Sequence, residues 1–148
     1  MLAVELKLNN GVKYVFCTCY RVGTLGVPHH DAVISSIRPI LSKTKPPKFF
    51  LIGDFNFSKT DWADGGSSTC KVEQNFIDSF SELGLKQHVT VPTHVKGNIL
   101  DVLYTNFEED VCDLEVMGHH SVCFSDHYAI KFNVAARINR KKYQRESF

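Results

Sequence analysis

Residues 48–57 most constrain what this chain can fold into: an apolar run over 48–53 ends in a carboxylate and an amide, Asp54 and Asn56. A short, nearly continuous apolar run is typical of a strand buried on both faces of a sheet. In an extended segment, Asp54 and Asn56 would share one face and Phe55 would point into the core. A simple Asx-type turn after the strand explains the same residues equally well.

Length and composition predict one globular domain. The 148 residues, 43% of them hydrophobic, suffice for a substantial core. No apolar run approaches the roughly 18 residues of a membrane span, and the alternation over residues 2–8 is a strand pattern and not a signal peptide. We therefore expect an intracellular protein, nuclear or cytoplasmic, without a membrane segment. The five cysteines lack CxxC spacing and indicate reduced structural thiols.

Alternating strand and helix patterns indicate a layered α/β (α+β) domain over residues 1–136. An Asn-Asn-Gly turn separates two N-terminal strand patterns, and helical apolar spacing recurs twice. Asp31 is the expected N-cap of the first helix, and Gly84 the stop of the second. The expected strands are 2–8, 12–20, 48–53, 86–91, 99–105, 111–117 and 127–134, the expected helices 31–43 and 71–83, and the long loop 57–71.

The C-terminal residues 137–148 carry five basic side chains and one acidic one, a net charge of +4 in a chain whose total is +1. Such a basic tail suits a nucleic-acid phosphate backbone. A solvated extension explains the composition equally well.

Polar residues at two further strand ends complete a candidate hydrolytic site. Cleaving a phosphodiester requires neutralised phosphate charge, an oriented water and support for the leaving oxygen. Asp54 suits metal binding or activation of water, and Asn56 can hold a phosphate oxygen without adding charge. His127 can donate hydrogen bonds to phosphate near neutral pH, and Asp101 can supply the carboxylate that orients it.

Five motifs occur in order between residues 14 and 134. They are Cys19-Tyr20-Arg21, Leu51–Phe57 with Asp61-Trp62, Phe76-Ile77-Asp78 with Leu83-Gly84-Leu85, Val91–His94 with Asn98–Asn106, and Ser125–Tyr128. In this order and spacing they resemble the C-terminal half of the endonuclease/exonuclease/phosphatase superfamily. Within it, the likeness is to the endonuclease domain of non-LTR (LINE-type) retrotransposons.

The resemblance implies a two-layered α/β sandwich that cleaves DNA with Mg²⁺ or Mn²⁺. It implies that Asp54 activates the attacking water, that Asp54 and Asp126 bind metal, and that Asn56 helps to hold the phosphate. A retrotransposon endonuclease also implies a larger polyprotein with a reverse transcriptase.

Three further roles follow from the same resemblance. His127 contacts the scissile phosphate, Asp101 orients His127, and Thr93 lies near the loop that faces DNA and helps to bind the substrate.

The motifs match only the C-terminal half of that domain. The family's metal-binding Glu and an active-site Asn come from strands that precede every motif found here. We therefore expect a partial sandwich, lacking its N-terminal half, with an exposed sheet face that favours self-association.

Three functional hypotheses remain. The first is a Mg²⁺-dependent DNA endonuclease, and the second is a catalytically inactive fragment that at most binds nucleic acid. A phosphoesterase acting on phospholipid or inositol phosphate is the third, and it is disfavoured by Asp61-Trp62 and Pro92-Thr93.

Overall fold

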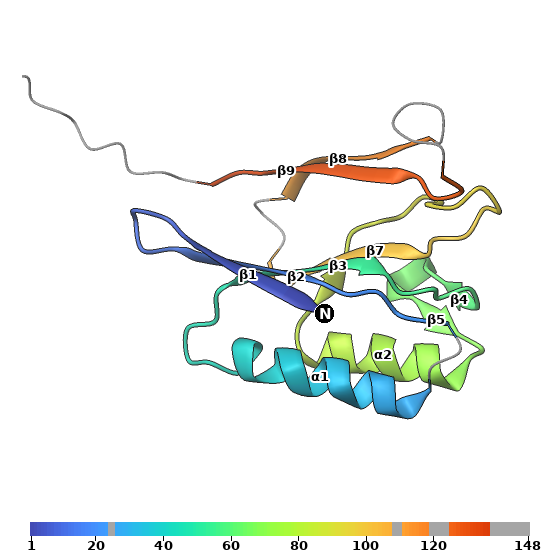
Figure 1. Ribbon diagram of the computed structural model, residues 1–148, viewed down its shortest axis with the longest axis horizontal. Coiled ribbons are helices and arrows are strands. Elements are labelled where there is room, and N and C mark those ends of the chain that lie inside the picture. The colour runs from blue at the N-terminus through green and yellow to red at the C-terminus, as the bar shows by residue number, and fades with distance from the viewer. Residues whose placement is uncertain (24–25, 108–110, 119–124, 137–148) are drawn as a thin grey trace, which may run out of the picture.

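A five-stranded mixed sheet forms the centre of the computed structural model, which describes residues 1–23, 26–107, 111–118 and 125–136 (Figure 1). Two helices cover one face of the sheet, and a separate two-stranded hairpin lies over the other. The fold is α+β, as predicted. In spatial order the central strands are β1 (Leu2–Lys7), β2 (Lys13–Thr18), β3 (Lys48–Asp54), β7 (Asp101–Thr105) and β6 (Lys86–Gln87); the helices are α1 (Val27–Leu41) and α2 (Lys71–Glu82), and the hairpin is β8 (Val111–Met117) and β9 (Ala129–Val134).

Strand β3 lies at the middle of the sheet and is buried on both faces, as its apolar run predicts. It pairs parallel with β2 and antiparallel with β7. Phe49 and Leu51 pack with the helices in one core cluster, whereas Phe50 joins the opposite cluster beneath β8 and β9. All three side chains are fully buried. This strand therefore ties the two hydrophobic layers together.

Strand β1 forms an edge of the sheet and carries the apolar surface expected for a partial sandwich. The predicted hairpin turn joins it to β2: Gly11 has φ +83°, and Asn10 Oδ1 accepts a hydrogen bond from Val12 N at 3.0 Å. Leu2, Val4 and Leu6 are each more than half exposed. Such a stripe on an unpaired edge favours association, and self-association of this chain stays a prediction.

Helix α1 begins one turn earlier than predicted. It starts at Val27 after Gly26, so Asp31 lies inside the helix and is not its N-cap. Pro28 explains the earlier start, because the first helical turn needs no proline N–H and the fixed φ of proline suits it. Pro39 lies close to the C-terminal end of the helix, which runs on to Leu41.

The segment 57–71, predicted as a plain loop, contains a small hairpin. Its strands are β4 (Thr60–Asp61) and β5 (Ser67–Ser68), with the 3₁₀ turn η1 (Ala63–Gly65) between them. The buried carboxylate of Glu73 on α2 organises it by accepting hydrogen bonds from Lys59 N, Thr60 Oγ1 and Ser68 Oγ. These contacts depend on tertiary structure, so composition alone suggested a loop.

The remaining elements follow the sequence pattern more closely. Helix α2 buries the predicted stripe of Phe76, Ile77 and Phe80, and Gly84 follows it with φ +70°. Strand β6 is shorter than the predicted 86–91. No helix in the described part of the chain is long and apolar enough to cross a membrane. The predicted basic tail, 137–148, lies outside the described residues.

Gly53 allows β2 and β3 to stay paired up to the point where the polar residues begin. Cys19 N donates to Ile52 O at 3.0 Å, and Arg21 N donates to Asp54 O at 2.8 Å. Between these bonds Gly53 has φ +151°, and a Cβ on it would lie 1.8 Å from the Cys19 carbonyl oxygen. A residue with a side chain would therefore push the two strands apart next to Asp54.

Gly53→Ala should destabilise the fold by more than about 3 kcal/mol, because backbone strain and a backbone clash act together. Thermal and urea denaturation followed by circular dichroism measure the loss. Gly118→Ala is the matched control, since an added Cβ there has no neighbour within 4 Å among the described residues. Equal stability of the two variants would contradict the close approach.

Candidate active site

Asp54, Asp101 and His127 meet at one end of the central sheet. Asp54 is the last residue of β3 and pairs in register with Asp101, the first residue of β7. His127 lies two residues before β9, and its Nδ1 is 2.8 Å from Asp101 Oδ2. Its Nε2 is 4.0 Å from Asp54 Oδ2. The side chains are 17–31% exposed, so solvent and a substrate can reach them.

The Asp101 contact fixes how His127 presents its ring. A carboxylate accepts hydrogen bonds, so Nδ1 carries a proton and donates it to Asp101. Nε2 is therefore the ring nitrogen turned toward Asp54 and the open side of the site. This is the arrangement that the resemblance implies for Asp101 and His127, and the catalytic roles of both residues stay predictions.

Neighbouring charges shift the protonation of the cluster. Burial alone would lower the pKa of His127, but the hydrogen bond and charge of Asp101, with Asp54 and Asp126 beyond, raise the pKa above its ordinary value of 6.5. Burial and the charge of Asp101 raise the pKa of Asp54, against the opposing hydrogen bond from Asn56 N and the charge of His127. The neighbouring carboxylates therefore stabilise the cationic form of His127 relative to a free imidazole.

Replacing Asp101 with Asn should lower the pKa of His127, because the charge that stabilises the imidazolium is removed. The Cε1–H resonance of His127, followed by NMR against pH, reports that pKa directly. In the wild type, protonated His127 contributes stability below pH 6.5, and this contribution is lost as pH rises through the raised folded-state pKa. Asp101→Asn should weaken that pH dependence. Asp31→Asn, at an exposed position of α1, is the control and should leave the His127 resonance unchanged.

Asn56 lies in a turn that leaves the sheet directly after Asp54. Its φ of +50° ends the extended backbone, so the strict alternation expected through Asn56 is wrong and the Asx-turn alternative is correct. Asn56 N donates to Asp54 Oδ1 at 2.9 Å, which closes that turn. Phe55 is fully buried, as predicted. The turn and the candidate site thus use the same residues.

A buried arginine, to which the sequence pattern assigned no role, holds this turn in place. Arg21 Nη1 donates to Phe55 O at 2.8 Å and to Asn56 O at 3.3 Å. In return, the side-chain amide of Asn56 donates to Arg21 O at 2.9 Å. The guanidinium also lies 5.4 Å from the centre of the Phe57 ring. In the sequence, Arg21 stood out only as part of the Tyr20-Arg21 motif. The motif did not indicate that Arg21 contacts the turn after Asp54.

Arg21→Lys should lower the free energy of unfolding by about 1–3 kcal/mol. The lysine ammonium lacks the planar guanidinium group whose N–H donors bind the two backbone carbonyls. Urea denaturation measures the change. Arg38→Lys, on the exposed surface of α1, is the matched control and should be near neutral. An Arg21 variant as stable as the Arg38 variant would contradict a supporting role.

Thr93 lies under the site, with its side chain facing inward. It is fully buried, and its Oγ1 accepts hydrogen bonds from Leu100 N and Asp101 N, both at 3.0 Å. Its carbonyl accepts a hydrogen bond from Tyr128 N at 2.7 Å. Thr93 therefore supports the backbone of Asp101 from a buried position, and its role in substrate binding stays a prediction.

Asp126 lies beside the cluster and not within it. Its side chain is 69% exposed, and Oδ2 lies 3.3 Å from Nε2 of His94, a buried residue to which the sequence pattern assigned no role. The hydrogen bond from His94 lowers the pKa of the Asp126 carboxyl. The predicted metal ligands Asp54 and Asp126 belong to two adjoining groups of potential ligands that share His127.

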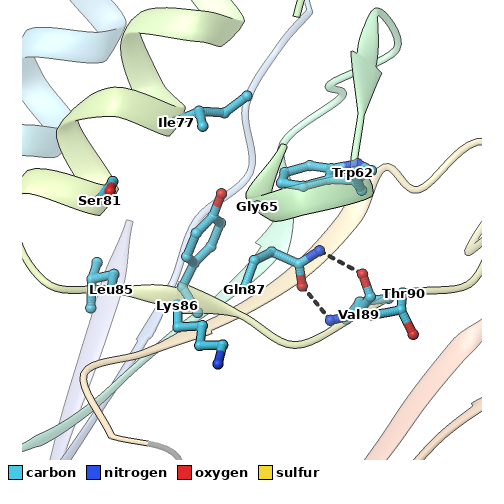
Figure 2. Close-up of a pocket in the computed structure, with 10 residues that line it drawn as sticks. Trp62, Gly65, Ile77, Ser81, Leu85, Lys86, Gln87, Val89 and Thr90 are labelled. Atoms are coloured by element: carbon cyan, nitrogen blue, oxygen red, sulfur yellow. Dashed lines mark hydrogen bonds between the residues drawn. The ribbon is translucent and has the colours of Figure 1, made fainter. Parts of the chain in front are cut away.

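A separate hollow of about 410 Å³ lies between α2, β6 and η1 (Figure 2). Ile77, Leu85 and Trp62 line it with mainly apolar surface, while a hydrogen bond between Gln87 and Val89 orders one wall. None of the predicted site residues lines this hollow. The hollow and the Asp54–Asp101–His127 cluster are therefore two separate sites.

Comparison with known proteins decides the family of the chain. The profile of the family described as "Endonuclease-reverse transcriptase" matches residues 14–131. The chain belongs to this family. The match spans all the residues of the cluster, together with Thr93, His94 and Asp126. A search of curated proteins finds no match.

A solved structure shares the fold. It is the "Endonuclease domain of TRAS1, a telomere-specific non-LTR retrotransposon", with a TM-score of 0.68 and 16% sequence identity. The similarity covers 90% of this chain and 60% of the TRAS1 chain. This chain therefore has the fold of an endonuclease-type domain and spans less than two thirds of that domain's length.

Proposed function

We propose that this chain hydrolyses DNA phosphodiester bonds as a metal-dependent endonuclease. The observation that carries the proposal is the Asp101–His127 pair facing Asp54 at the sheet end. It combines a carboxylate that can activate water with an oriented imidazole that can bind a phosphate oxygen. Membership of the endonuclease–reverse transcriptase family supports this chemistry, with DNA as the substrate and a reverse transcriptase in the same polyprotein.

The carboxylates supply a donor set suited to Mg²⁺ or Mn²⁺. Both ions prefer hard oxygen ligands and keep several of their own waters. One oxygen of Asp126 faces His94, which leaves its other oxygen for an ion, and Asp54 Oδ1, which accepts a hydrogen bond from Asn56 N, keeps a second lone pair for the same purpose. We assign metal binding to Asp54 and Asp126, which belong to adjoining groups of potential ligands. When bound, the ion would neutralise phosphate charge and lower the pKa of a coordinated water.

The remaining roles follow from the hydrogen-bonding capacity of each side chain. Asp54 Oδ2 is the oxygen that faces the His127 ring and can accept a proton from an attacking water. The cationic form of His127 carries a proton on Nε2 that can be donated to a phosphate oxygen. Asn56 uses one amide hydrogen on Arg21 O, and the second can hold another phosphate oxygen.

A second candidate function is nucleic-acid binding without catalysis. It is favoured by the position of Asp126, whose side chain is 69% exposed and lies beside the cluster of Asp54, Asp101 and His127, not within it. A metal ligand held outside the cluster would contribute less to transition-state stabilisation. The basic residues 137–148 would supply phosphate contacts in either case.

Nicking of supercoiled plasmid by the purified chain in Mg²⁺ tests the proposal. Asp54→Asn and His127→Gln should each lower the nicking rate by about 10²–10⁴-fold, since each removes a group that acts on the reacting atoms. Asp31→Asn, an exposed carboxylate of α1, should leave the rate unchanged. EDTA should abolish nicking, and added Mn²⁺ should restore it.

Two outcomes would contradict the endonuclease. Equal nicking by the wild type and both variants would trace the activity to another nuclease. A folded wild-type chain that retards DNA in a gel but does not nick it would favour binding without catalysis.

A further inference from the structure

We propose that His94 is a positioning residue that holds the Asp126 carboxylate in place by donating a hydrogen bond to it, and that it is not itself a metal ligand. This inference rests on the proposed function, because it concerns how Asp126 is presented to a divalent ion. The sequence analysis placed His94 in the Val91–His94 motif but predicted no role for it.

The backbone around His94 joins the two halves of the site. His94 and His127 form an isolated antiparallel bridge, and their rings meet edge to face with centres 5.0 Å apart. Val95 N donates to Asp126 O at 2.9 Å. His94 is 7% exposed, whereas the Asp126 side chain is 69% exposed. A buried ring thus lies against a carboxylate whose side chain is exposed to solvent.

The hydrogen bonds of His94 determine which nitrogen carries its proton. Lys96 N donates to His94 Nδ1 at 3.1 Å, so Nδ1 is the acceptor and has no hydrogen. In a neutral imidazole the hydrogen then lies on Nε2. Nε2 is 3.3 Å from Asp126 Oδ2 and donates to it. The backbone of residues 94–96 therefore selects the tautomer that binds Asp126.

The same tautomer argues against a metal at His94. His94, Asp126 and His127 offer ligand atoms within 4.8 Å of one another, which by distance alone would suit an ion. Metal binding at Nε2 would require the hydrogen on Nδ1, directly opposite the Lys96 N–H, so two donors would face each other. His94 therefore suits the outer shell, where a hydrogen bond to a ligating carboxylate directs its other oxygen toward the ion.

Two substitutions separate the two hydrogen bonds of His94. His94→Gln places an amide N–H near the position of Nε2, and it can retain the bond to Asp126. His94→Asn places an amide oxygen near the position of Nδ1, and it can retain the bond from Lys96 N while losing the donor to Asp126. Comparing them distinguishes support of the carboxylate from support of the turn.

Binding of Mn²⁺ to the whole chain without DNA, followed by the EPR signal of the free ion, tests the proposal. The dissociation constant for Mn²⁺ should rise about 10- to 100-fold in His94→Asn and stay within about threefold of wild type in His94→Gln. Asp126→Asn should weaken binding similarly, and combining it with His94→Asn should add little, because both act through one carboxylate. Thermal denaturation of each variant shows whether the turn survives.

A nicking assay gives a second readout. His94→Asn should need a higher Mg²⁺ concentration for half-maximal rate yet approach the wild-type rate at saturating Mg²⁺, whereas His94→Gln should follow wild type. If the wild-type chain binds Mn²⁺ but nicks no DNA, the endonuclease proposal fails and the binding data still judge His94. Equal Mn²⁺ affinity in all His94 variants, equal weakening in both, or no Mn²⁺ binding by the wild type would overturn the inference.

Discussion

The antiparallel register of β3 and β7 is the constraint on which the candidate site depends. It places Asp54 opposite Asp101, at the ends of two strands whose central residues are buried. Because side chains alternate along a strand, a slip of one residue would send either carboxylate to the other face of the sheet. Burial of Phe49, Phe50 and Leu51 in two separate clusters holds β3 in this register. The core therefore sets the geometry of the polar residues.

Buried polar side chains hold the backbone segments next to the ends of β3 and β7 in place. Thr93 Oγ1 receives two backbone N–H groups at the start of β7, and Arg21 caps two carbonyls after β3. His94 ties the 125–128 segment to the same region. Each of these side chains is buried, so leaving its partner unsatisfied would be costly. The site is supported by residues that need not touch a substrate.

Much of this fold follows from local patterns. The first hairpin follows from Asn-Gly turn chemistry, α2 from its apolar stripe and glycine stop, and β3 from its continuous apolar run. The start of α1 and the hairpin within residues 57–71 could not be read in this way. Pro28 begins a helix that lacks a capping side chain, and Glu73 organises the hairpin through contacts made only when α2 has packed.

The sequence by itself determined the buried strand that ends in Asp54, the order of the motifs and the residue types from which a site could be built. These features depend on neighbours along the chain. The tertiary structure decided that His127 donates to Asp101, 26 residues away, and that His94 reaches Asp126, 32 residues away. It also decided that Thr93 faces inward. Such contacts depend on strand register and backbone hydrogen bonds between distant segments, which a pattern of residue types does not specify.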